Sequence, residues 1–167
     1  MNRFIIFIIS VYIGFGTTSG QVINKAITGM SFSTNEFTVN AKSDSLWGKL
    51  NTPKTLAEIM GMTLRGGSNK LTEVGTAVTM TTEHDTGVVI MTYRKGRNEI
   101  RFIFEPDSGT YLFQDVWKLK QVGANQTKVV FERRYVRPIA IPMGQIADLI
   151  RFLEEHIARL KEMVEKK

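Results

Sequence analysis

The chain has 167 residues, a formal net charge of +6 and no cysteine. A chain of this length fits one domain with a single hydrophobic core. The absence of cysteine excludes disulfides, thiolate metal sites and cysteine nucleophiles. The basic residues are scattered among acidic ones and form no clustered stripe, which phosphate binding usually needs, so we expect no nucleic-acid partner.

The first twenty residues have the layout of a secretory signal. Arg3 precedes an apolar run at 4–15, and small and polar residues follow at 16–20. A membrane-spanning helix needs about 20 apolar residues, which is longer than this run. We therefore predict a signal peptide at 1–20, cut before Gln21, and a secreted or periplasmic protein that contacts a membrane only transiently. An uncleaved membrane tether and an ordinary buried strand are the alternatives.

One domain is predicted at 30–167, after a linker at 21–29. Apolar and polar residues alternate over 30–39, which predicts a first strand, bulged near Asn35.

Two short helices are expected next. Ser43 or Asp44 is predicted to cap the first helix, and Thr52 the second, because these residue types accept hydrogen bonds from the free N–H groups of a first turn. Pro53 suits the first position of the second helix, where its missing N–H would have had no partner.

Beyond residue 61 the sequence pattern changes to short strands separated by turn residues. The expected strands cover 62–65, 76–82, 88–94, 98–104, 110–119 and 127–136. Connections this short cannot join parallel strands, which need a crossover of a dozen or more residues. The sheet is therefore predicted to be an antiparallel meander.

The C-terminal segment is predicted to be one long helix that starts at Met143 or Gly144. Apolar residues recur every three or four positions and draw one stripe: Ile146, Leu149, Ile150, Leu153, Ile157, Leu160, Met163 and Val164. At about 1.5 Å per residue the helix spans roughly 30 Å, enough to cross the concave face of a sheet. The fold class is α+β: a helix-grip arrangement in which a curved antiparallel sheet of six to seven strands wraps the C-terminal helix.

Five short stretches carry a resemblance to a known superfamily. They read FTVNA at 37–41, SLW at 45–47, LTEVG at 71–75, DVWKL at 115–119 and TKVVFERRY at 127–135. Their order resembles the START-like or Bet v 1-like superfamily (SRPBCC type), which includes polyketide cyclase and lipid-transport relatives. The resemblance implies an apolar cavity between sheet and helix that binds lipids, sterols or polyketides. It transfers no catalytic residues, and the plain amphipathic helix at 51–60 departs from the aromatic-rich stretch of many relatives.

The last predicted hairpin places an acid and a base inside an aromatic lining. If Leu119 pairs with Val129, the antiparallel register also pairs Trp117 with Phe131, Asp115 with Arg133, and Phe113 with Tyr135. Alternation puts all these side chains on one face, and their apolar members indicate that it is the inner face.

Further residues extend this lining. Ile100, Phe102 and Phe104 face Met91 and Val89 in the neighbouring hairpin. The predicted ligand-binding residues are Ile100, Phe102, Phe113, Asp115, Trp117, Phe131, Arg133, Tyr135 and Leu153, and core packing is the alternative for the apolar ones.

The Asp115 and Arg133 side chains have two interpretations. Buried charges are tolerated when they are paired and hydrogen-bonded, so the two groups either form a structural ion pair or together hold the polar end of a ligand.

The two histidines indicate no metal site. His84 lies in a predicted turn, and His156 flanks the helical stripe, where we expect a residue at the helix edge. Neither has metal-ligand spacing to the other, whereas a catalytic metal usually has three protein ligands. The sequence also has no G-x-S-x-G elbow and no phosphate-loop pattern. We therefore predict no metal, no cofactor and no transferable catalytic set.

Three functions are compatible with these patterns. The first is an exported binding protein that holds a hydrophobic small molecule or lipid between sheet and helix. The second is a cyclase- or dehydratase-like enzyme that acts on a polyketide-like substrate, with Asp115 or Tyr135 as general acid or base and Arg133 tuning it. The third is a protein-interaction module that uses the outer sheet face or the basic loop with Arg94, Lys95 and Arg97. The oligomeric state stays open.

Overall fold

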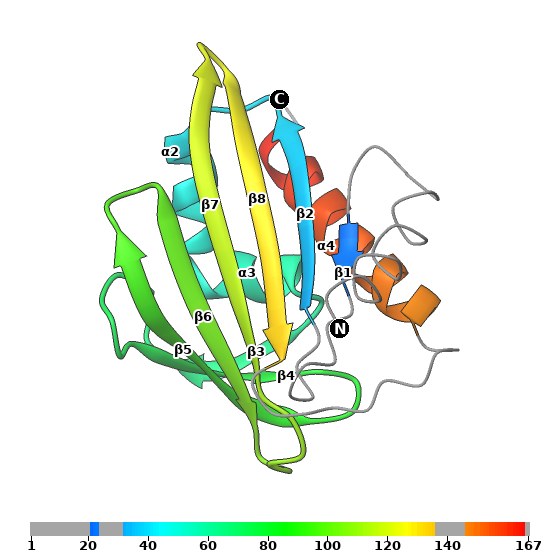
Figure 1. Cartoon of the computed structure of the whole chain (residues 1–167). Helices are drawn as coiled ribbons and strands as arrows, with labels where there is room; N and C mark the ends of the chain where they lie inside the picture. The colour runs from blue at the N-terminus through cyan, green and yellow to red at the C-terminus, as the bar shows by residue number, and fades with distance from the viewer. Residues whose placement is uncertain (1–20, 24–31, 136–145, 166–167) are drawn as a thin grey trace, which may run out of the picture.

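The computed structural model describes residues 21–23, 32–135 and 146–165. Figure 1 shows one antiparallel sheet with the helices of the described residues behind it. The predicted signal segment at 1–20 lies outside the described residues, so cleavage and export stay predictions.

Seven strands, β2 to β8, form the open sheet, and a three-residue strand, β1, adds to one edge. The order across the sheet is β1-β2-β8-β7-β6-β5-β4-β3, and every neighbouring pair is antiparallel. The strands are β1 (Gln21–Ile23), β2 (Phe32–Val39), β3 (Thr63–Gly67), β4 (Ala77–Thr81), β5 (Thr86–Lys95), β6 (Glu99–Pro106), β7 (Phe113–Gly123) and β8 (Gln126–Tyr135). The run from β3 to β8 is the predicted meander, and β2 joins it beside β8.

The N-terminal edge differs from the expected pattern in two ways. Gln21–Ile23, which the sequence placed in a linker, pair with β2 as β1. The predicted bulge near Asn35 is wrong, because all eight residues of β2 pair with β8 in unbroken register. Asn35 therefore keeps its place in the alternation and points to the buried side, where only 4% of its surface is exposed.

The two short helices follow β2 as predicted, but their caps differ. Helix α2 (Ser43–Leu50) has Lys42 at its N-cap, so Ser43 and Asp44 lie inside the first turn. Helix α3 (Pro53–Ile59) has Thr52 at its N-cap and the proline in its first turn, yet the Thr52 hydroxyl makes no capping bond. It donates instead to the carbonyl of Gly48 at 2.9 Å.

Several strand ends are longer than expected. β3 continues through Gly66 and Gly67, beyond the predicted strand end at residue 65, with an irregularity between Leu64 and Gly66. β7 and β8 extend to Gly123 and Gln126, so only two residues separate them, whereas the predicted strands at 110–119 and 127–136 are seven residues apart. Backbone pairing thus continues into polar segments whose composition alone indicates a loop.

The long helix α4 (Ile146–Glu165) closes the inner side of the sheet. Its predicted start at Met143 or Gly144 lies outside the described residues. Arg159 Nε donates to the Ile59 carbonyl at the end of α3 at 3.1 Å, and Glu165 Oε1 accepts from the Asn40 amide after β2 at 2.7 Å. These bonds fix α4 against both α3 and the edge of β2.

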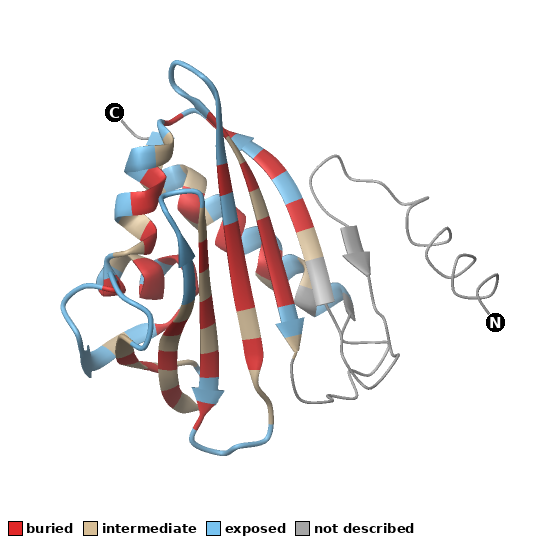
Figure 2. Ribbon diagram, turned by 60° about the vertical axis from the view of Figure 1, so that its left-hand side comes forward, coloured by how far each residue is buried: buried red, intermediate tan, exposed pale blue. Residues whose placement is uncertain are grey.

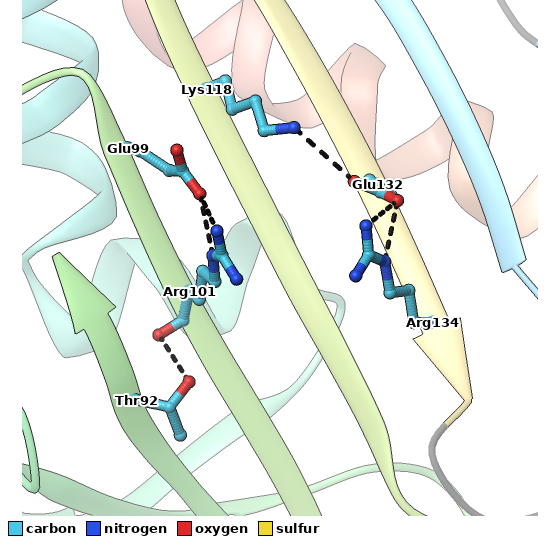
Figure 3. A network of polar contacts seen from close by, with 6 residues as sticks. All are labelled: Thr92, Glu99, Arg101, Lys118, Glu132 and Arg134. Atoms are coloured by element: carbon cyan, nitrogen blue, oxygen red, sulfur yellow. Dashed lines mark hydrogen bonds and ion pairs between the residues drawn. The ribbon is translucent and has the colours of Figure 1, made fainter. Parts of the chain in front are cut away.

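The two faces of the sheet have different chemistry. Buried and more exposed residues alternate along the strands, which gives the striped colouring of Figure 2. The outer face carries ion pairs (Figure 3), among them Arg101 with Glu99 at 2.6 Å and Glu132 with Arg134 at 2.5 Å. Partly exposed pairs of this kind contribute little to stability, so the core between the inner face and the helices holds the fold together.

Candidate ligand-binding site

The hairpin formed by β7 and β8 supplies most of the predicted site. Its register is the one expected from the sequence: Leu119 pairs with Val129, Trp117 with Phe131, Asp115 with Arg133, and Phe113 with Tyr135. Seven of these eight side chains are buried, and Tyr135 is partly buried. The structure thus brings the predicted acid, base and aromatic groups together on the inner face.

Asp115 and Arg133 form a buried ion pair. Arg133 Nε donates to Asp115 Oδ1 and Nη2 donates to Oδ2, each at 2.7 Å. The two residues are 0% and 1% exposed. The guanidinium carbon lies 4.0 Å from the centre of the Phe113 ring and 5.5 Å from that of Phe152. A paired, fork-shaped contact of this kind is the strongest form of carboxylate binding.

Arg133 and Asp115 compensate each other's charge. Burial by itself lowers the pKa of Arg133, but the charge of Asp115 and the hydrogen bonds to it outweigh burial, so the pKa lies above its usual value. Tyr135 is the next partner of the guanidinium, and burial raises the pKa of its phenol despite the positive charge nearby. At neutral pH the arginine is therefore charged and the Tyr135 phenol is protonated.

Apolar side chains from β6 and α4 complete the lining. Phe102 lies opposite Asp115 on one side and Met91 on the other, and Ile100 lies opposite Trp117. Both β6 residues are buried, and Leu153 from α4 is 1% exposed in the same hydrophobic cluster. Contact between these residues and a ligand stays a prediction.

His156 does not lie at a helix edge, as the sequence analysis expected. It is 0% exposed. Its ring lies 4.3 Å from that of Phe152, edge to face, and 6.3 Å from that of Phe131, nearly parallel. The spacing carried the signal, because position 156 follows Leu153 by three and precedes Leu160 by four. Histidine is a polar residue type, however, and polar residues are usually expected at the edge of an apolar stripe.

The environment of His156 keeps its ring neutral. Burial and then the charge of Arg133 lower the pKa of the imidazole well below its usual value of 6.5, and the hydrogen bond to the Phe152 carbonyl opposes this only in part. That bond joins Nδ1 to the carbonyl oxygen at 2.7 Å. Arg159 Nη2, which can only donate, lies 3.1 Å from the same nitrogen. Nδ1 cannot serve both partners, and the shorter contact, to a carbonyl that only accepts, assigns the proton to Nδ1.

Buried polar atoms without partners occur on this histidine and on the two residues that flank Phe131 in the sheet. In the described part of the chain, Asn35 Nδ2, Trp117 Nε1 and His156 Nε2 are buried and make no hydrogen bond. A fourth such atom, Asn51 Oδ1, lies at the C-terminal end of α2. Buried polar groups are nearly always paired, so the first three mark a place where a partner is missing. Trp117 is among the predicted lining residues, whereas Asn35 and His156 are not.

His84, in contrast, lies in an exposed turn as expected. The part of the chain that the structure describes contains no group of three His, Asp or Glu side chains able to hold a metal ion. Within the same residues, no helix has the length and apolarity required to cross a bilayer.

Comparison with solved structures identifies the fold. A START superfamily protein from Mycobacterium smegmatis superimposes with a TM-score of 0.62 at 12% identity, over 80% of this chain and 97% of that chain. The Aha1 dimer from Colwellia psychrerythraea gives a TM-score of 0.60 at 14% identity, over 79% of this chain and 94% of that chain.

The chain therefore has a START-like fold.

A third solved structure is similar in fold. DynU16, from the dynemicin biosynthetic locus, gives a TM-score of 0.59 at 18% identity, over 78% of this chain but only 46% of that chain. No family model matches the sequence. No curated protein matches it either. The superfamily resemblance is thus confirmed for the fold, while the ligand and the chemistry must be argued from the site.

Proposed function

We propose that this START-like chain is a binding protein that holds a hydrophobic small molecule or lipid between the sheet and helix α4. The observation that carries the proposal is the buried aromatic lining with three unpaired polar atoms beside it. An unpaired buried donor or acceptor costs about 1–3 kcal/mol. A ligand that pairs these atoms recovers that cost on binding.

The apolar lining supplies affinity without catalytic groups. Burial of apolar surface contributes about 25 cal/mol per Å². Contact with aromatic side chains such as Phe102 and Phe131 is therefore sufficient to bind a hydrophobic molecule. Small-molecule sites in proteins commonly combine such a lining with a few placed polar groups. The inner face of this sheet has that composition.

The enzymatic alternative has less support from the geometry. Asp115 was the first acid or base considered, yet both of its oxygens bind Arg133. The match to a protein from a biosynthetic locus keeps a cyclase-like activity in view. Turnover of polyketide-like substrates that is lost in Asp115→Asn and in Tyr135→Phe, with folding intact, would favour the enzyme over the carrier.

The interaction-module alternative also loses support. Arg97 pairs with Asp44 at 3.0 Å, and the Arg94 guanidinium lies 5.5 Å from the centre of the Trp47 ring. Two of the three basic groups expected to face a partner thus already have partners within the chain. A salt-sensitive pull-down of an acidic partner would restore this alternative.

The proposed carrier acts outside the cytoplasm, on the strength of the signal-like segment at 1–20. We expect the mature chain to start at Gln21, the first residue of β1. N-terminal mass spectrometry of the full-length chain, expressed in a host with a secretory pathway, tests this. Protein that keeps Met1 and remains in the cytoplasm would contradict export and leave the carrier function standing.

Two measurements test the binding itself. Native mass spectrometry of gently purified protein should show an added mass that solvent extraction removes. The neutral fluorescent probe N-phenyl-1-naphthylamine should then bind the emptied protein. Phe102→Leu, on the inner face, should change the affinity for the probe, whereas Tyr93→Leu, at an exposed position on the neighbouring strand, should not. Protein that is always empty and binds no probe would refute the proposal.

A further inference from the structure

Phe131 is the common neighbour of the three residues that carry unpaired polar atoms. On β2, Asn35 is its partner in the register, and on β7, Trp117 is its partner on the other side. The Trp117 and Phe131 rings stack at 4.1 Å, and His156 of α4 lies parallel to Phe131 at 6.3 Å. β2, β7 and α4, which are far apart in the sequence, thus each place one polar side chain near the Phe131 ring. We call Asn35, Trp117 and His156 the polar triad.

The polar triad offers donors and an acceptor together. The amide nitrogen of Asn35 and the indole nitrogen of Trp117 only donate. His156 carries its proton on Nδ1, which faces the Phe152 carbonyl, so Nε2 presents a lone pair and accepts. Arg159 Nη2, which only donates, lies 3.1 Å from Nδ1, but the Phe152 carbonyl is the closer partner at 2.7 Å, so the proton is assigned to Nδ1 and Nε2 is left unpaired.

We propose that the molecule held in this site is a neutral apolar compound with a hydroxyl group, an alcohol or a phenol, whose oxygen and hydrogen pair with Trp117 and His156 of the polar triad. This inference rests on the proposed binding function and names the ligand class. The hydroxyl oxygen accepts from Trp117 Nε1, and its hydrogen is donated to His156 Nε2.

Other head groups match the polar triad less well. A carboxylate has no hydrogen for His156 Nε2, and an ammonium group has no lone pair for the two donors. A hydrocarbon leaves all three atoms unpaired. The nearby ion pair does not change this match, because Asp115 and Arg133 neutralise each other through two bonds of 2.7 Å.

Three probes that share one ring system separate these head groups. The full chain, freed of any bound molecule by extraction, is titrated with 2-naphthol, naphthalene and 2-naphthoate at neutral pH. One or two added hydrogen bonds predict that 2-naphthol binds about tenfold more tightly than naphthalene. We expect 2-naphthoate to bind more weakly than 2-naphthol.

Variants assign the preference to the polar triad. His156→Phe keeps an aromatic ring and removes the acceptor, and Trp117→Phe removes the indole donor. Each should bring the affinity ratio of 2-naphthol to naphthalene close to one. His84→Gln, in the exposed turn, should keep the wild-type ratio. A ratio that survives both Phe substitutions would overturn the inference.

The wild-type protein gives a second test that needs no variant. Its two indole N–H groups, Trp47 and Trp117, give separate NMR signals, and 2-naphthol should move the Trp117 signal much more than naphthalene does. Equal shifts with both probes, or equal affinities, would overturn the hydroxyl preference and leave the binding function intact. If neither probe binds, the binding function fails and the inference fails with it.

Discussion

Arg133 and Asp115 face each other across β8 and β7 and are joined by two hydrogen bonds of 2.7 Å in the interior of the domain. Each charge is tolerated there only because the other is present. The pair therefore connects the fold and the proposed site, and its removal has consequences that separate the two roles.

Arg133→Leu should strongly destabilise the protein. It leaves the Asp115 carboxylate buried without a counter-charge, which typically costs about 3–5 kcal/mol in the free energy of unfolding. The double variant Asp115→Leu/Arg133→Met removes both charges and should recover most of that loss. Urea unfolding of both variants measures this. A single variant as stable as wild type that no longer binds ligand would show instead that Arg133 serves binding.

The stability of the protein should fall in mild acid because of His156. The folded protein keeps this ring neutral well below pH 6.5, whereas the unfolded chain binds a proton near that pH. Stability is therefore complete above about pH 6.5 and decreases as the pH falls toward the folded-state pKa, by up to about 1.4 kcal/mol per pH unit.

Variants of the two histidines test this assignment. In His156→Phe the decrease below pH 6.5 should be reduced, and in His84→Gln it should persist. Unfolding curves between pH 7.5 and 5 give the comparison. Equal pH dependence in wild type and His156→Phe would show that other groups cause the decrease.

Asn35→Leu should make the empty protein more stable. The substitution replaces an unpaired buried donor with an apolar side chain of similar size, which removes a cost of about 1–3 kcal/mol. Thr38→Val, at an exposed position of the same strand, should change stability by no more than about 0.5 kcal/mol. Both can be measured by thermal unfolding after extraction. A loss of stability in Asn35→Leu would mean that the amide is satisfied in the folded protein.

Two glycines should respond in opposite directions to substitution by alanine. A Cβ on Gly87 would lie 2.7 Å from the Pro106 Cα and 2.8 Å from the Phe104 ring, so Gly87→Ala should cost about 1–3 kcal/mol. Gly48 lies inside α2 with nothing within 4 Å of its Cβ position. Gly48→Ala should therefore stabilise the helix by about 0.5–1 kcal/mol. Unfolding midpoints that move in the same direction would contradict this contrast.

The sequence predicted the hairpin of β7 and β8 well, because period-two alternation and one short turn leave a single register that buries the apolar side chains. That register brought Asp115 to Arg133 without any tertiary information. The long helix was equally well defined by its apolar stripe.

The polar triad could not be found in the same way. Asn35 and His156 occupy buried positions of a strand and a helix, but pattern reading assigns polar residue types to bulges and helix edges. Their burial follows from the packing of α4 on β8 and from the unbroken pairing of β2, both of which are tertiary features. A polar residue at an apolar position of an otherwise regular pattern is the signal that was available.

The most direct test of the account is the location of bound 2-naphthol by intermolecular nuclear Overhauser effects. The account predicts contacts from the naphthol ring to the Leu153 methyl groups and to the Trp117 indole, which lie between helix and sheet. Contacts confined to the exposed side chains of Val74, Tyr93 and Val122, or no contacts at all, would contradict it.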